Sequence, residues 1–331
     1  MNDEYLWDGS GDPDPDVQRL EVLLSRYRSQ SPLRVIRLRP GPIAWAQRGA
    51  IAALILAGAF ASYLALLPRF GQPGREWEVA ARAGTPTIEG APLQGRGALR
   101  VGQALHTDAT SRAEIRAGSV GRIEVEPGSV LRLVQSGQQR HRLSLERGRI
   151  SARLWSPPFT FSFASPSAVA TDLGCAFTLD AGENGEDRVR VTSGWVEFHW
   201  EDRQELIPAG ASAIAKRGIG PGTAFFDDAS DEFKSALREI DFGPPGHRAS
   251  LEILLRNARA RDVYSLLRLS VRLGGSDRGL IYDRAAQLAP PPPGVTRQAF
   301  IDRDPGAFEL WVDSLGLGNA KRWWVHWKDV F

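Results

Sequence analysis

Residues 188–200 read RVRVTSGWVEFHW, and this stretch shows the pattern that recurs through the central part of the chain. Apolar and polar residues alternate through 188–191 and again through 195–200. Side chains of a strand point in turn to the two faces of a sheet, so this alternation predicts strands with one buried face. The pair Ser193-Gly194 between them predicts the turn of a hairpin.

The same alternation recurs from Val79 to about Lys216. Further segments of this kind are 113–116, 122–125, 131–133, 142–145, 148–154 and 159–163. They follow one another at roughly 8–12-residue spacing with glycine-rich turns, of which Gly118-Ser119 is one. Such a series is typical of a sandwich, a barrel or a β-solenoid, and these alternatives stay open. Carboxylates in these segments fall at alternating positions, and we expect them on the solvated face.

Six short blocks occur in a fixed order within residues 84–210. They are Gly84–Gly90, Leu99–Thr107, Ser111–Val120, Leu143–Ile150, Ser165–Ala170 and Val189–Val196. In this order they resemble the FecR domain, the extracytoplasmic part of transmembrane regulators of the iron-citrate type. The usual Gly-Thr-x-Phe of that family reads Gly-Cys-Ala-Phe at 174–177 here. The resemblance implies a β-rich signalling domain. We expect its fold to tolerate Cys175 in place of the family's threonine, because cysteine and threonine are both small.

A run of nineteen residues without a charge, GAIAALILAGAFASYLALL at 49–67, precedes the β region. At about 1.5 Å per residue, a helix of this length crosses a hydrocarbon core of roughly 30 Å. A buried helix is usually shorter and amphipathic. A signal peptide is the other alternative, but the apolar run continues past the cleavage-like Ala59-Phe60-Ala61. The run therefore predicts a single transmembrane helix.

Positive charges near this run predict its orientation. Those before it are Arg34, Arg37, Arg39 and Arg48, and those after it are Arg69, Arg75 and Arg82. The bias favours a cytoplasmic N-terminus, since positive residues concentrate on the cytoplasmic side of a span. We expect a single-pass protein of the inner (plasma) membrane, with its C-terminal body in the periplasm.

The arm of residues 1–48 contains one short amphipathic helix, which Asp14 could cap with Pro15 in its first turn. Its apolar residues at helical spacing are Val17, Leu20, Leu23, Leu24 and Tyr27. A helix this short is marginal in water, so we expect these residues to bind a partner. Family resemblance suggests a sigma factor or another cytoplasmic regulator. A second copy, the membrane surface and a disordered tail are the alternatives.

The periodicity becomes helical after Pro221-Gly222. Apolar residues at helical spacing include Phe233, Leu237, Ile240, Leu251, Leu254, Val263, Leu266 and Leu273. Gly274-Gly275 predicts a helix end, and Ser276 or Asp277 could cap the next helix. The segment 321–328 combines basic residues with Trp323, Trp324 and Trp327. It predicts either a contact surface or a terminal helix that buries its tryptophans.

Composition and motifs restrict the function. The chain has 331 residues, a formal charge of +2 and a single cysteine, Cys175. An intramolecular disulfide is therefore excluded, and a lone cysteine in an apolar stretch is usually a small buried hydrophobe. Nucleotide-binding, zinc-protease and nucleophile-elbow motifs are missing, and the five histidines lack metal-like spacing. We expect no enzyme activity, catalytic residue, cofactor, metal or nucleic-acid partner.

These features predict a mixed multidomain fold. Its parts are a cytoplasmic arm (1–48), a transmembrane helix (49–67), an all-β FecR-like domain of short antiparallel strands (79–216) and a small all-α domain (228–331). The expected function is a FecR-type regulator that relays an outside protein or ligand signal to the cytoplasm, with control of a sigma factor as one route. An outer-membrane or envelope protein could add a strand to the β domain. The alternative is a membrane-tethered periplasmic binding or scaffold module without signal transfer.

Overall fold

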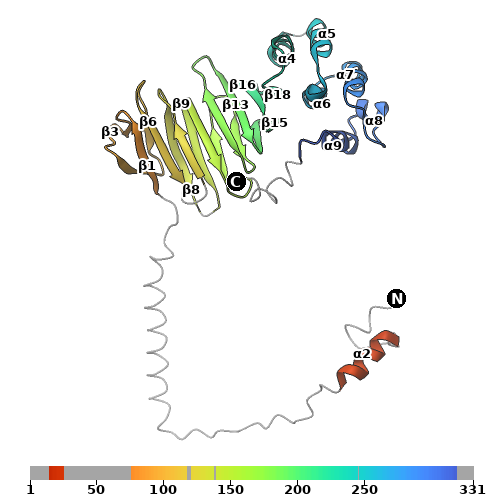
Figure 1. Ribbon diagram of the computed structural model, residues 1–331, viewed down its shortest axis with the longest axis horizontal. Helices are drawn as coiled ribbons and strands as arrows, with labels where there is room; N and C mark the ends of the chain where they lie inside the picture. Colours follow the sequence, from red (N-terminus) through yellow and green to blue (C-terminus); the bar gives the residue numbers. More distant parts are fainter. Residues whose placement is uncertain (1–14, 26–75, 118–120, 138, 245, 319–331) are drawn as a thin grey trace. The chain divides into compact units, whose positions relative to one another are not determined.

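The computed structural model describes residues 15–25, 76–117, 121–137, 139–244 and 246–318 (Figure 1). It divides into two units, residues 1–67 and 68–331, which we describe separately. In the first unit the described residues form α2 (Pro15–Ser25). The predicted membrane span at 49–67 lies outside the described residues. None of the helices that are described is long and apolar enough to cross a membrane.

The described strands of the second unit form one continuous network of pairs, in which β9 (His141–Leu154) takes part in two sheets. Sheet A contains β4 (Arg96–Arg100), β1 (Glu76–Ala83), β6 (Arg112–Ala117), β7 (Gly121–Val125), β9, β12 (Ala176–Ala181), β13 (Glu186–Ser193) and β16 (Ala211–Lys216), with β17 (Gly220–Pro221) and β18 (Phe225–Phe226) on β16. Sheet B contains β3 (Ala91–Pro92), β2 (Thr87–Ile88), β5 (Ala104–His106), β8 (Val130–Ser136), β9, β10 (Phe161–Ala164), β11 (Val169–Asp172), β14 (Trp195–Trp200) and β15 (Arg203–Pro208).

The core is formed by the inward-facing apolar residues of both sheets, which belong to one buried cluster. Phe163 of sheet B meets Phe177 of sheet A edge to face, with ring centroids 5.3 Å apart. Alternation along the strands produces this core, because every second side chain faces inward. A mostly β structure is thus confirmed, but the single buried face does not hold for every strand, because β16 is buried on both faces.

Strand β9 passes from one sheet to the other at Gly148. Leu143 and Leu145 are buried in its first half, whereas Ile150 and Ala152 are buried in its second, so the inward positions change from odd to even. Gly148 has φ +88°, a conformation that glycine adopts without steric cost. The sequence predicts two segments here, and the structure joins them into one bent strand.

The predicted connections are partly right. Strands β6 and β7 are an antiparallel pair around the predicted turn, whose residues 118–120 are not described. The hairpin predicted at Ser193-Gly194 is wrong, because β13 pairs with β12 and β16 whereas β14 pairs with β11 and β15. Gly194, at φ +72°, is instead a corner between the sheets. Strand β10 also pairs in parallel with β9, so not every pairing is antiparallel.

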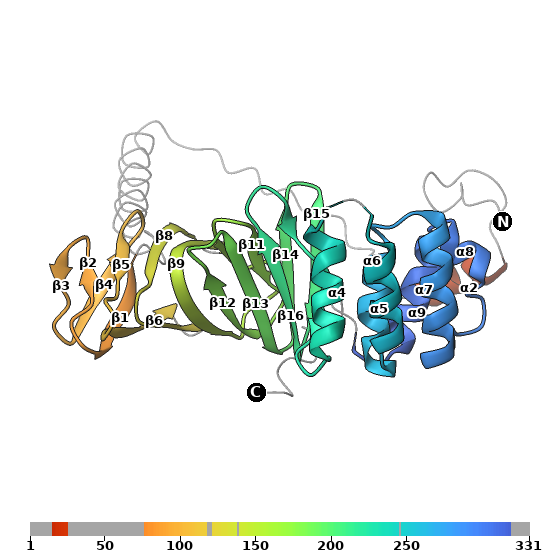
Figure 2. The same ribbon diagram turned by 90° about the horizontal axis from the view of Figure 1, so that it is seen from above.

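Helices follow the last strands, and Figure 2 shows α4 beside β16 with the others beyond it. They are α4 (Asp231–Phe242), α5 (Arg248–Asn257), the 3-10 turn η1 (Ala260–Asp262), α6 (Val263–Ser270), α7 (Gly275–Leu288), α8 (Arg297–Ile301) and α9 (Pro305–Ser314). Their apolar faces form a second buried cluster that includes Phe233, Leu266 and Trp311, which confirms a helical C-terminal part. The N-cap of α7 is Gly274, so the predicted cap at Ser276 or Asp277 is wrong. The tryptophan-rich segment 321–328 lies outside the described residues.

Candidate functional site

Helix α2 holds the residues predicted to bind a partner. Leu20, Leu23 and Leu24 are exposed on 57%, 67% and 61% of their surface, and Val17 also belongs to the helix. Tyr27 lies outside the described residues. The three leucines stand at i, i+3 and i+4, so they share one face of the helix. Val22, which lies off this face, is exposed as well, on 73% of its surface, and the binding role of the leucines stays a prediction.

A second candidate site is the junction of the β strands with α6. Tyr264 of α6 is 2% exposed and belongs to the buried cluster of the two sheets. Its hydroxyl donates a hydrogen bond of 2.7 Å to the carbonyl oxygen of Leu206 in β15. Its ring packs against Trp195 with centroids 6.1 Å apart. Burial raises the pKa of Tyr264, so the hydroxyl stays a donor.

Two buried carboxylates and two arginines tie the same junction together. Glu205, 1% exposed, accepts hydrogen bonds from Arg268 Nε at 3.0 Å and from Arg272 Nη2 at 3.1 Å. Asp241 accepts from Arg272 Nη1 at 3.0 Å and from the backbone N–H of Thr223 at 2.7 Å. The four side chains carry two negative and two positive charges, as a buried ionic cluster requires.

The pKa shifts of this cluster follow from its burial and its pairing. Burial raises the pKa of Asp241, and the nearby Arg272 opposes that shift only in part. Burial lowers the pKa of Arg268, but the adjacent Glu205 more than compensates and leaves it above its usual range. Arg268 therefore stays charged at every physiological pH.

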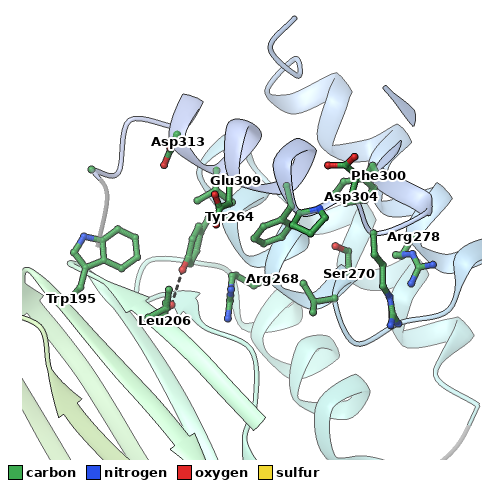
Figure 3. A pocket seen from close by; sticks show the side chains of 16 residues that line it. Trp195, Leu206, Tyr264, Arg268, Ser270, Arg278, Phe300, Asp304, Glu309 and Asp313 are labelled. Carbon is green, nitrogen blue, oxygen red and sulfur yellow. Dashed lines mark hydrogen bonds between the residues drawn. The ribbon is translucent and has the colours of Figure 1, made fainter. Parts of the chain in front are cut away.

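A cavity of about 410 Å³ opens at this junction (Figure 3). Trp195 and Leu206 line it from the strands, Tyr264 and Arg268 line it from α6, and α8 and α9 supply the opposite side. Half of its apolar lining residues are aromatic, with Phe300 and Phe308 among the residues of the helices. Charged lining residues are Arg268, Arg278, Arg303, Asp304, Glu309 and Asp313. Such a mixture suits a ligand with an apolar body and a few polar groups.

A third buried polar group lies inside the β part. Asp172 is fully buried, and its Oδ1 accepts hydrogen bonds from the Cys175 thiol at 2.6 Å and from the Gly174 N–H at 3.0 Å. Ser156 donates to Oδ2 at 3.3 Å. Burial raises the pKa of Asp172 to about 7 against the effect of these donors. Burial and the neighbouring Asp172 raise the pKa of Cys175, so its thiol is a buried donor and no nucleophile.

The expectation that the carboxylates of the β region are solvated is wrong for several of them. Asp172, Asp187 and Glu205 are each at most 1% exposed. The signal for Glu205 is present in the sequence, because it stands two residues before buried Ile207 and so faces the same side of β15. Among the described residues, no group of three His, Cys, Asp or Glu is placed to hold a metal ion.

Comparison with known proteins gives limited similarity. No family model matches this chain. No curated protein matches it either. Two crystal structures of a "putative anti-sigma factor" from Parabacteroides distasonis, at 1.65 and 2.50 Å resolution, each match 40% of this chain with 15% identity and a TM-score of 0.33. The match spans 63% and 62% of those chains, less than two thirds of their length. The resemblance to the FecR domain stays a prediction.

Proposed function

We propose that this chain is a single-pass membrane regulator of the FecR type, in which the body receives a signal outside and α2 engages a cytoplasmic regulator such as a sigma factor. The observation that carries the proposal is the exposure of Leu20, Leu23 and Leu24 on one face of α2. Burying a leucine side chain contributes about 1.5–3 kcal/mol. A partner that covers this stripe would thus gain several kcal/mol and stabilise a helix too short to persist alone.

The junction cavity is the proposed receiving site. A ligand seated there would touch strands through Trp195 and helices through Phe308 at once. It would therefore favour the arrangement in which α9 packs closely against the strands. A ligand shifts such an equilibrium only by the difference between its affinities for the two arrangements. Through a single span, the resulting change would pass to the arm by association, rotation or proteolysis of the chain.

The test is capture of partners by the tagged full chain from solubilised membranes. The variant with Leu20, Leu23 and Leu24 changed to alanine removes the stripe, and Gln18→Ala with Arg19→Ala is the matched control on exposed polar positions of the same helix. We expect one cytoplasmic regulator with the unchanged chain and the control but not with the triple variant. Capture of the same proteins by all three chains would contradict the proposal.

Orientation has a separate test. Alkaline phosphatase is active only outside the cytoplasm, so a fusion after residue 331 should be active and a fusion ahead of residue 1 of the full chain inactive. The reverse pattern, or equal activity of both fusions, would remove the topology on which the proposal depends.

A membrane-tethered binding or scaffold module without signal transfer is the second candidate. The observation that favours it is the cavity itself, which lies within the second unit and uses no residue of the arm. Deleting residues 1–30 separates the two functions. If the arm relays a signal, the deletion should abolish signalling while the body stays folded. If the chain is a tethered module, the deletion should leave its binding activity intact.

A further inference from the structure

A row of arginines crosses the outer face of sheet A. Arg116 of β6 stands directly opposite Arg122 of β7, and Arg122 stands opposite Arg153 of β9. All three are exposed. Like charges at directly opposed positions destabilise a sheet, so an anion that bridges them would relieve a cost built into the fold.

The nearest carboxylate neutralises this row incompletely. Glu114 is almost buried and accepts hydrogen bonds from Arg82 Nη2 at 2.6 Å and from Arg116 Nε at 3.0 Å. It also forms an ion pair with Arg122, whose Nε lies 3.6 Å away. One carboxylate thus serves three guanidinium groups. Among the described residues, Arg153 has no ion-pair partner. The row keeps a local excess of positive charge.

A groove of about 350 Å³ adjoins the row. Arg122, Arg153 and half-buried Trp155 line it. The remaining polar lining residues are Glu124, Ser151, Thr178 and Thr192. Arginines, one indole and several hydroxyls thus meet in one open depression on the sheet face.

The strands beneath the groove exclude recognition by strand addition. Strand β7 pairs with β6 and β9, and β12 pairs with β9 and β13, so each strand is paired on both sides. A peptide strand would find no free backbone groups there. A ligand must be recognised by side chains alone.

We propose that this groove binds an acidic polysaccharide, whose carboxylates pair with Arg122 and Arg153 while a sugar ring packs on Trp155. Guanidinium groups pair with carboxylates in a two-pronged geometry, and an indole offers a flat apolar face. Glu124 lies in the same groove, where it accepts hydrogen bonds from sugar hydroxyls but repels a ligand that carries only negative groups. This charge disfavours polyphosphate and nucleic acid.

The test is titration of the full chain in detergent with oligogalacturonate. The same oligomer with methyl-esterified carboxylates keeps the rings without the charge, and inorganic polyphosphate keeps charge without rings. Arg153→Gln removes one proposed contact. The matched control is Arg188→Gln. It removes the same charge from an exposed position on β13, in the same sheet but outside the groove.

We expect Arg153→Gln to weaken oligogalacturonate binding about tenfold and Arg188→Gln less than twofold. Trp155→Phe should weaken it as well, and Glu124→Gln should tighten polyphosphate more than oligogalacturonate, because the amide keeps an acceptor for sugar hydroxyls but removes the charge that repels phosphates. Equal effects of the two arginine variants, equal binding of the methyl ester, tighter binding of polyphosphate than of oligogalacturonate by the unchanged chain, or no binding at millimolar concentration would each overturn the proposal. The groove contains no residue of the predicted span or of α2. A negative result in this titration therefore leaves the proposed contact of α2 with a regulator untouched, and a negative capture experiment leaves the proposed polysaccharide site untouched.

Discussion

Changing Glu205 to glutamine should loosen the attachment of α6 to the strands. The variant keeps the size of the side chain but removes its charge. Arg268 then loses its carboxylate partner in the described structure, whereas Arg272 still has Asp241. The buried cluster would carry one uncompensated positive charge. Removing one member of a buried ion pair costs about 3–5 kcal/mol.

The lower end of that range applies, because the amide oxygen of glutamine still accepts from Arg268 and from the backbone N–H of Ala224, which lies 3.2 Å from Glu205 Oε1. A cost of about 3 kcal/mol corresponds to a factor of about 150 in an opening equilibrium. We expect the backbone amides of α6 to exchange with solvent faster by about this factor, since local opening governs their exchange.

The assay is hydrogen–deuterium exchange of the full chain in detergent, followed on peptides from α6. Glu252→Gln is the matched control, because Glu252 pairs with Arg248 at 3.3 Å with 57% of its side chain exposed. Exposed pairs contribute at most about 1 kcal/mol. The double variant Glu205→Gln with Arg268→Met restores neutrality and should recover part of the protection. Equal exchange in Glu205→Gln and Glu252→Gln would show that the buried charge pair does not hold α6 on the strands.

Three further outcomes are expected. Asp172 has a folded pKa raised to about 7 by burial, so its contribution to stability is present below pH 4 and is lost as pH rises toward 7. The free energy of unfolding, measured against Asp172→Asn, should fall by up to about 1.4 kcal/mol per pH unit in that window, and parallel curves would contradict this. Cys175 should react with a thiol reagent only in denaturant, because burial raises its pKa. Gly148→Ala should cost more than about 2 kcal/mol in denaturant titrations, since its Cβ would lie 2.5 Å from Ser129 Cα, whereas Gly102→Ala, with open space around it, should cost about 1–2 kcal/mol.

The sequence predicts the strands well but their partners poorly. Alternation is local, so β6, β7 and the halves of β9 are visible in it. Pairing between distant segments is not local, and neither the corner at Gly194 nor the parallel contact of β10 follows from any short pattern. A left-handed glycine serves a hairpin and a corner equally well.

The buried charges were missed for a related reason. Carboxylates on strands are usually solvated. The local sequence distinguishes Glu205 from such residues only by its position two residues before Ile207, which places both on the same face of β15. Its partners lie more than sixty residues away, Arg268 in α6 and Arg272 in the turn after it, so the pairing depends on the docking of two regions. The acceptor of the Cys175 thiol is close in sequence, yet only burial makes Asp172 hold its proton up to about pH 7.

The proposed regulator requires contact between α2 and a cytoplasmic protein, and photo-cross-linking in intact cells detects that contact. A photoreactive residue replaces Leu23 on the apolar stripe or Gln18 on an exposed polar position away from the stripe. We predict one adduct with a cytoplasmic regulator from position 23 and none from position 18. No adduct from position 23, or the same adducts from both positions, would contradict the account.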